Sequence, residues 1–142
     1  MSLFFVLLAM LLVGAGNAWA QKALPYSYGF EDNNLAADGW TLASTASNTG
    51  ISNSAKRTGT YSFRFYYNTN PPQYLISPQL TVPSNATNVK MSLYHRAQSA
   101  SYTETFKVGY STTDNNIASF TWEEEVSTKS TTFDQYTATF PK

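Results

Sequence analysis

Apolar and polar residues alternate with a period of two along most of the chain after residue 25. Such alternation is typical of β-strands that have one buried face and one solvent-exposed face. Turn-forming residues separate the alternating segments, and no window shows helical periodicity. The pattern predicts about eight strands, which lie within residues 26–31, 40–42, 60–67, 74–82, 88–97, 102–112, 120–126 and 133–140.

The segments between these strands are predicted to be loops. Residues 21–25 are expected to form a loose leader, and residues 32–39 a loop before the second strand. Residues 43–59 are rich in Ser, Thr, Asn and Gly, which indicates a long loop with a short strand near Ile51. The apolar faces of three later strands are expected to be Tyr61, Phe63 and Phe65; Val89, Met91 and Leu93; and Tyr136, Ala138 and Phe140.

Pro78 interrupts the strand predicted over residues 74–82. Proline lacks a backbone N–H, so a sheet accepts it at an edge or at a bulge. We therefore expect the strand to bend or bulge at Pro78 and then to resume, as strands do where a sandwich turns a corner. Strands of this length and spacing predict an antiparallel all-β sandwich, jelly roll or barrel.

The first residues follow a different pattern from the rest of the chain. An apolar run at residues 3–13 is too short to span a bilayer, and Ala18 and Ala20 form an Ala-x-Ala cleavage pattern. We predict a signal peptide at residues 1–20 and one mature domain at residues 21–142, without membrane insertion after cleavage. No Lys or Arg precedes the run, which departs from the usual signal, and a buried N-terminal helix is the alternative.

Composition indicates an extracellular domain. The chain has no cysteine, so packing or a bound ion must hold an exported domain together, and the lack of disulfides favours a bacterial source. Nine basic and nine acidic residues give a formal net charge of 0. Without a basic block to neutralise phosphates, nucleic acid is excluded as an expected partner. The 10 Tyr and 9 Phe suit half-buried, pleated surfaces.

The ordered succession of several segments resembles a known family. The segments are "YSYGFED…GW", "AKRTGTYSFRF", "YLISPQLTVP", "VKMSLYHRA", "ETFKVGYSTT" and "FDQYTATFP". Together they resemble the cleaved-adhesin or choice-of-anchor J family of MAM-like modules, which includes the adhesin modules that accompany the gingipain peptidases. The resemblance covers residues 26–141.

The resemblance implies a concanavalin-like jelly-roll β-sandwich that is secreted or displayed on the cell surface. It also implies a non-catalytic role in adhesion to a host protein, glycan or particulate substrate, as part of a larger multidomain protein. Family members usually continue with further strands after the last matching segment, so we expect a module that lacks its C-terminal strands, with an unprotected sheet edge. The alternatives are an accessory structural module of an exported peptidase and a fragment of a sandwich-fold carbohydrate-active enzyme.

The resemblance also implies structural calcium. The matching opening supplies Glu31, Asp32 and Asp38, with Asn33 and Asn34 nearby. Calcium takes six to eight oxygen ligands, usually from several loops. The alternative is a polar loop whose carboxylates hold no ion.

Exposed aromatic side chains are candidate contacts for a sugar ring. Tyr66, Tyr67 and Trp122 are the predicted ligand-binding residues, and Tyr94 and Tyr102 are also expected to face outward. The alternative is that these rings are packed, as most aromatic side chains on strands are.

The sequence offers no convincing catalytic site, and we predict that the chain is not an enzyme. Glu123 and Glu125 fall on one face of a predicted strand, about 7 Å apart by strand rise. Glycosidases use a pair of carboxylates at such a spacing, but an acidic solvent-exposed face is the simpler interpretation. His95 is the only histidine, and its place in the alternation predicts a residue at the edge of the core, hydrogen-bonded to backbone.

Overall fold

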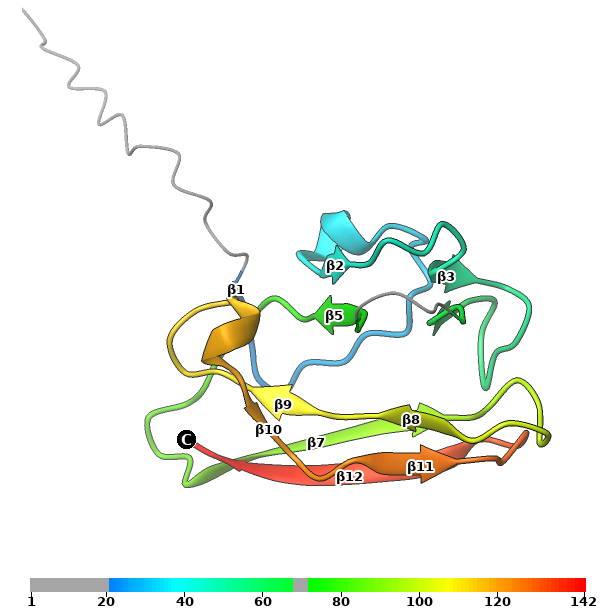
Figure 1. Cartoon of the computed structure of the whole chain (residues 1–142). Helices are drawn as coiled ribbons and strands as arrows, with labels where there is room; N and C mark the ends of the chain where they lie inside the picture. Colours follow the sequence, from blue (N-terminus) through cyan, green and yellow to red (C-terminus); the bar gives the residue numbers. More distant parts are fainter. Residues whose placement is uncertain (1–20, 68–71) are drawn as a thin grey trace, which may run out of the picture.

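The computed structural model describes residues 21–67 and 72–142, in which all the extended regular structure is short β-strands (Figure 1). Apart from the 3₁₀ helices η1 (Leu35–Asp38) and η2 (Ile117–Ser119), these residues contain no helix, which confirms the all-β prediction. Neither short helix has the length or the apolar composition to cross a bilayer. The strands are β1 (Gln21–Ala23), β2 (Thr41–Ala43), β3 (Gly50–Ser52), β4 (Ser62–Arg64), β5 (Tyr74–Ile76), β6 (Gln79–Thr81), β7 (Asn88–His95), β8 (Glu104–Phe106), β9 (Gly109–Tyr110), β10 (Thr121–Trp122), β11 (Val126–Thr128) and β12 (Asp134–Pro141).

The strands pair two by two and form two layers, as in a β-sandwich (Figure 1). One layer contains β2 paired with β5 and β3 paired with β4. The other contains β7 with β12, β8 with β11 and β9 with β10, and all these pairs are antiparallel. β1 and β6 form the one parallel pair among the described strands. The jelly-roll order of the connections stays a prediction.

The longest ladder, β7 with β12, confirms the predicted inward faces of both strands. Val89, Met91 and Leu93 are half-buried, while the residues between them are exposed. Phe140 lies opposite Val89, is only 7% exposed and packs against Tyr110 with ring centroids 5.1 Å apart. Because this apolar face points toward the second layer, the core lies between the two layers. The fully or nearly buried apolar side chains there are Ile76, Ala97, Val108 and Phe140.

Pro78 lies between β5 and β6, where the sequence predicts that the strand over residues 74–82 is interrupted. The segment pairs with β2 as β5, breaks at Ser77 and Pro78, and resumes as β6 beside β1. Pro78 is fully buried, although it makes no ladder hydrogen bond through its nitrogen. Because the missing N–H falls where the chain changes its pairing partner, no donor is lost from either ladder.

The predictions for residues 21–31 were wrong in two respects. Gln21–Ala23 is a strand rather than a loose leader, because it pairs in register with β6. Residues 26–31 alternate between half-buried and exposed, yet they have no ladder partner. Tyr28 and Phe30 turn inward because they pack against Trp40, at centroid distances of 5.4 and 5.9 Å. Phe30 has φ 66°, which is incompatible with an extended strand.

The strand predicted over residues 60–67 is shorter than expected. Only Ser62–Arg64 is paired, with β3, the short strand predicted near Ile51. Beyond it the backbone N–H of Tyr66 donates to the Thr49 hydroxyl at 2.8 Å instead of to a neighbouring strand. Phe65, expected on the buried face, is 51% exposed.

The strands predicted over residues 102–112 and 120–126 are each divided in two. Phe106 pairs with Val126 and Gly109 with Trp122, so two residues on one side face three on the other. This extra residue is a β-bulge, which bends the ladder and ends regular pairing. The backbone N–H of Glu123 donates to the Val108 carbonyl at 2.8 Å and holds the bulge closed.

Candidate binding surface

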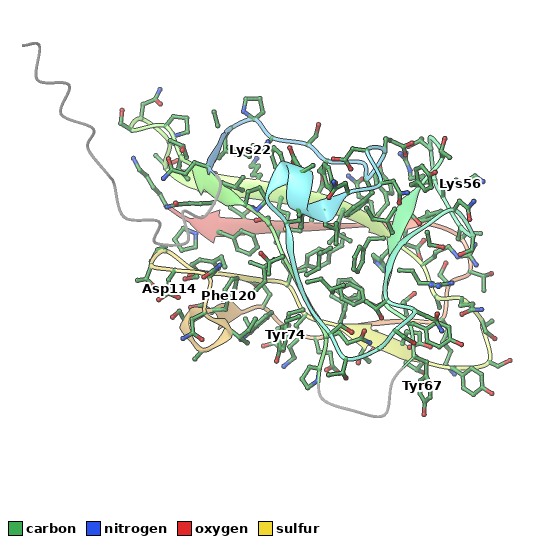
Figure 2. All side chains as sticks on the ribbon, turned by 90° about the horizontal axis from the view of Figure 1, so that it is seen from above. Lys22, Lys56, Tyr67, Tyr74, Asp114 and Phe120 are labelled. Atoms are coloured by element: carbon green, nitrogen blue, oxygen red, sulfur yellow. The ribbon has the colours of Figure 1, made fainter. Side chains whose placement is uncertain are left out.

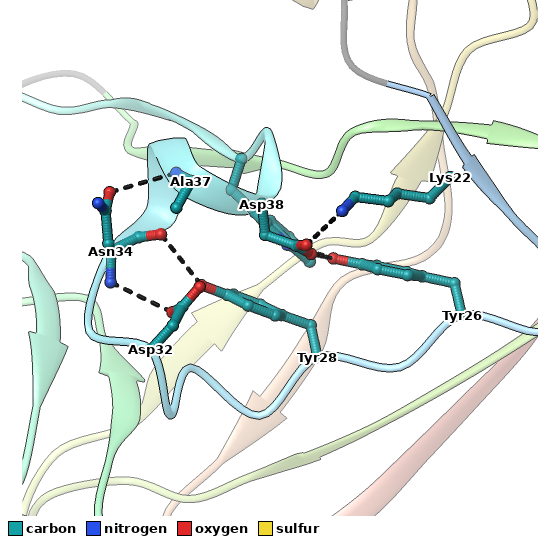
Figure 3. Close-up of polar contacts among 8 residues, drawn as sticks. Lys22, Tyr26, Tyr28, Asp32, Asn34, Ala37 and Asp38 are labelled. Carbon is teal, nitrogen blue, oxygen red and sulfur yellow. Dashed lines mark hydrogen bonds and ion pairs between the residues drawn. The ribbon is translucent and has the colours of Figure 1, made fainter.

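The acidic opening segment folds into the turn that precedes η1 (Figure 3). Asn34 begins the helix, because its Oδ1 accepts a hydrogen bond from the backbone N–H of Ala37 at 3.2 Å. The helix places Asp38 where Lys22 of β1 and the hydroxyl of Tyr26 both donate to its carboxylate. The turn therefore connects β1, through the carboxylate of Asp38, to the layer that contains β2 and β5.

The pKa values of Asp38 and Tyr26 shift in opposite directions. Donation from Lys22, and then from Tyr26, lowers the pKa of Asp38 below its ordinary value of 3.8. Burial, followed by the hydrogen bond to Asp38, raises the pKa of Tyr26 to about 12. Trp40 Nε1 donates to the Tyr26 hydroxyl at 2.7 Å. At neutral pH the cluster is an ionised carboxylate held by two donors.

Glu31 holds a different loop. Its Oε2 accepts from the backbone N–H of Thr60 at 2.9 Å, and its Oε1 accepts from that of Tyr61 at 3.2 Å. Gly59, at φ 66°, turns these two N–H groups toward the carboxylate. A Cβ at Gly59 would lie 2.6 Å from the Glu31 carboxylate carbon, so no larger residue fits. The carboxylate binds backbone rather than facing Asp32 or Asp38.

The positions of Glu31, Asp32 and Asp38 do not fit the prediction that their three carboxylates surround one calcium ion. Asp32 Oδ1 accepts from the Tyr28 hydroxyl at 2.6 Å and from the backbone N–H of Asn34 at 3.2 Å. Glu31 and Asp38 are engaged by the donors described above. Within residues 21–67 and 72–142, no three acidic, His or Cys side chains gather as a metal site would require. Calcium binding stays a prediction, which the stability experiment below tests.

All five aromatic side chains expected to face outward do so. Tyr67 and Tyr102 are the most open, at 77% and 69% exposed, and Tyr66, Tyr94 and Trp122 lie between 40% and 42%. The structure does not bring the three predicted ligand contacts together. The Arg64 guanidinium lies 5.3 Å from the Tyr66 ring centroid, whereas Trp122 contacts other rings.

Trp122 forms an aromatic row with Tyr74 and Phe120, which sequence reasoning missed. Its ring lies 5.6 Å from Phe120 in a stacked arrangement and 5.8 Å from Tyr74. Figure 2 shows Phe120 and Tyr74 close together, away from Tyr67. Gly109 lies opposite Trp122 in the ladder, and a Cβ there would approach the indole to 2.7 Å. The only sequence signal was a tryptophan and a glycine in strands that could pair.

A hollow of about 280 Å³ adjoins this row. It lies between the end of the β2–β5 ladder and η2, and it shares Tyr74 with the row. Its lining is Ala43, Ser44, Thr45, Pro72, Tyr74 and Ile117. We call the aromatic row Tyr74, Phe120 and Trp122, together with this hollow, the tryptophan cleft. It offers a packed, partly exposed indole next to a mostly apolar recess.

The residues considered for catalysis lie on two separate segments of the structure. Glu123 and Glu125 lie in the bulge between β10 and β11, not on one face of a continuous strand. His95 packs edge-on against Phe106 at 4.8 Å, and its Nδ1 is buried without a hydrogen-bond partner, so the expected bond from that nitrogen to backbone is not formed. No carboxylate is hydrogen-bonded to His95 in the described residues, so no acid–base pair forms around it.

Comparison with known proteins agrees with this description. No curated protein and no solved structure matches the chain. One family model, described as the Cleaved Adhesin Domain, matches residues 17–139. The match spans both layers of the sandwich and confirms the resemblance to the cleaved-adhesin family. Members of the family are generally non-catalytic, and the chain belongs to the cleaved adhesin domain family.

Proposed function

We propose that the chain is the adhesion module of an exported bacterial protein, secreted or held at the cell surface, and that it attaches this protein to a host protein, a glycan or a particulate substrate. Membership of the cleaved adhesin family supports a binding role rather than a reaction. The observation that favours a ligand of its own is Trp122, which is 40% exposed although it is held against Gly109 and stacked on Phe120. A rigid exposed ring loses little conformational freedom when a ligand covers it.

The tryptophan cleft is the proposed contact surface. Large aromatic side chains in well-packed positions dominate the energetics of many interfaces, and they are most effective beside a recess that excludes water. Tyr74 lines the hollow of about 280 Å³ and its ring centroid lies 5.8 Å from that of Trp122, so one ligand can cover the rings and fill the recess. Tyr67, although more exposed, is not among the residues that line this hollow.

The test measures binding of the full chain to immobilised host matrix proteins, a glycan array and insoluble polysaccharide particles. Trp122→Ala is expected to weaken binding by at least about tenfold, as loss of an aromatic anchor does. Tyr102→Ala is the matched control, because it also removes an exposed ring but lies in a loop away from the cleft. Trp122→Ala also removes packing against Phe120 and Tyr74, so it should lower the melting temperature more than Tyr102→Ala does. Affinities are therefore compared at a temperature at which circular dichroism shows both variants folded.

The result also separates the alternatives. Absence of binding to every target would contradict the adhesion proposal and leave the accessory structural module. Hydrolysis of a β-glucan that is lost in Glu123→Gln would instead favour the carbohydrate-active enzyme fragment. Binding that Trp122→Ala leaves intact would keep the function but move it away from the tryptophan cleft.

A further inference from the structure

Arg57 has an unusual environment for an exposed cation. Its guanidinium carbon lies 3.6 Å from the centroid of the Tyr94 ring, which is van der Waals contact. All three arginines lie over aromatic rings, but Arg64 also donates to the Asn48 carbonyl at 2.9 Å and Arg96 to its neighbouring carbonyl. Within the described residues, the Arg57 guanidinium has neither a hydrogen-bond acceptor nor a carboxylate partner. It is therefore a held cation whose donors remain available.

Stacking on the ring determines which donors are available. The face of the guanidinium covers Tyr94, so its N–H groups point outward in the plane of the stack. That edge matches the two oxygens of a carboxylate or a sulfate, which it binds through two parallel hydrogen bonds. An arginine already ordered by an aromatic ring loses less freedom when it binds such an anion.

The surface next to Tyr94 is polar and hollowed. Tyr94 lies on the outward face of β7, and Gln135 of β12 is its direct partner across the ladder. Gln135 also lines a hollow of about 460 Å³ on this ladder. The polar residues around the hollow are Lys90, Ser92, Gln135, Thr137 and Thr139. We call this hollow, with Arg57 and Tyr94 at one end, the arginine face.

The charges on the arginine face have one sign. Lys90 lies four residues before Tyr94, so the two positions are about 13 Å apart along the strand. No acidic side chain is among those that line the hollow, and the side chains between the cations are hydroxyls and an amide. This arrangement favours an extended ligand with repeated negative charges and with hydroxyl groups between them.

We propose that the arginine face binds an acidic polysaccharide, whose carboxylate or sulfate groups pair with Arg57 and Lys90 while sugar hydroxyls bond to Gln135, Ser92 and Thr137. The inference rests on the proposed adhesion function and gives it a second surface and a ligand class. An acidic peptide is a poorer match, because its apolar side chains would need apolar partners. Tyr94 is the one large apolar side chain exposed on this ladder.

The experiment measures binding of the full chain to a uronate polysaccharide, a sulfated polysaccharide, neutral dextran and poly-glutamate over a range of salt concentrations. Both acidic polysaccharides, or one of them, should bind, and dextran should not. Arg57→Ala should weaken that binding by about tenfold and reduce its salt dependence. Arg57→Lys keeps the charge without the paired donors, so it should restore only part of the affinity.

Lys56→Ala is the matched control, because it removes a neighbouring exposed cation that stacks on no ring in the described structure. It should change affinity by less than about threefold. Equal losses in Lys56→Ala and Arg57→Ala would overturn the inference, because they would indicate only diffuse attraction. Equal binding of poly-glutamate would overturn the choice of sugar.

The two proposals fail differently. If the chain binds targets through Trp122 but ignores acidic polysaccharides, the arginine face inference is overturned and the adhesion function stands. If no target of either kind is bound, both are overturned. Unchanged melting of Arg57→Ala verifies that a loss of affinity is not a loss of folding.

Discussion

Glu31→Gln should destabilise the domain whether or not calcium is present. The carboxylate accepts two backbone N–H groups, from Thr60 and Tyr61. The amide keeps one acceptor and turns an NH₂ group toward the other N–H, so one charge-assisted bond is replaced by two opposed donors. We expect a loss of about 1–2 kcal/mol in the free energy of unfolding, reduced from the buried range because Glu31 is exposed.

A loss of that size corresponds to a fall of about 3–8 °C in melting temperature for a domain of this length. Gly59→Ala tests the same contact from the other side, because its Cβ would displace the Glu31 carboxylate and its φ of 66° disfavours alanine. It should lower the melting temperature at least as much. Glu124→Gln is the charge-matched control, since Glu124 is exposed and has no hydrogen-bonding partner in the described residues.

The assay is thermal unfolding followed by circular dichroism, with and without a chelator. We expect the melting temperature of Glu31→Gln to fall equally in both conditions. If Glu31 held calcium, the chelator would lower the melting temperature of the parent chain but leave Glu31→Gln unchanged, by the linkage of binding to stability. That pattern, or a variant that melts like the parent, would refute the loop-holding role of Glu31.

Four further predictions concern acid–base behaviour and packing. Because the folded-state pKa of Asp38 is lowered, its contribution to stability is present above pH 3.8 and is lost as the pH falls through the folded value. Asp38→Asn should therefore reduce the fall in melting temperature at acidic pH. Because the pKa of Tyr26 is raised from 10.0 to about 12, its contribution is lost between these values at high pH. Tyr26→Phe should reduce the alkaline decline, and the part that remains is expected from Tyr28, whose pKa burial also raises. Ile76 is 8% exposed, so Ile76→Ala should lower the free energy of unfolding, measured in urea, by about 2–4 kcal/mol. Tyr67→Ala, which removes an exposed side chain, should lower it by less than about 0.5 kcal/mol. Gly109→Ala should displace the indole of Trp122 and change the tryptophan emission spectrum, and an unchanged spectrum would contradict the packing of that ring on Gly109.

The sequence predicted strands best where alternation was long. Residues 88–97 and 133–140 alternate over eight or more positions, and the structure pairs them with each other and buries the expected face. Residues 26–31 show why alternation alone is not enough. Their aromatic side chains turn inward to pack on Trp40, so every second position is half-buried without any strand pairing. Alternation reports which side chains are buried, whereas a strand also needs a backbone partner.

The candidate surfaces were predictable only in part, for a related reason. That Trp122 and Tyr94 would be exposed followed from their positions in alternating segments, and the structure confirms it. What lies beside each ring depends on contacts between distant segments. Tyr74 of β5 contacts Trp122 of β10, which lies in the other layer. Arg57 contacts Tyr94 from a loop whose sequence has no periodicity. The local alternation pattern carries no information on such pairings. It therefore predicted which rings are exposed but not which residues lie next to them.

These surfaces depend on loops that the domain must keep in place without disulfides. Few apolar side chains in the described residues are fully buried, so the core alone fixes the loops weakly. Polar side chains that bind distant backbone groups add the missing restraint. Glu31 holds the loop at Thr60, and Gln73 Nε2 donates to the Tyr66 carbonyl at 2.8 Å.

The arginine face shows the consequence for binding. Arg57 lies in the loop that ends at Gly59, three residues before Thr60, whose backbone N–H donates to Glu31 as that of Tyr61 does. The contact that stabilises the loop thus also limits how far Arg57 can move from Tyr94. We therefore expect Glu31→Gln to weaken acidic-polysaccharide binding as well as folding, even at temperatures where the variant is fully folded. Unchanged affinity under those conditions would show that the stack on Tyr94 positions Arg57 without help from the loop.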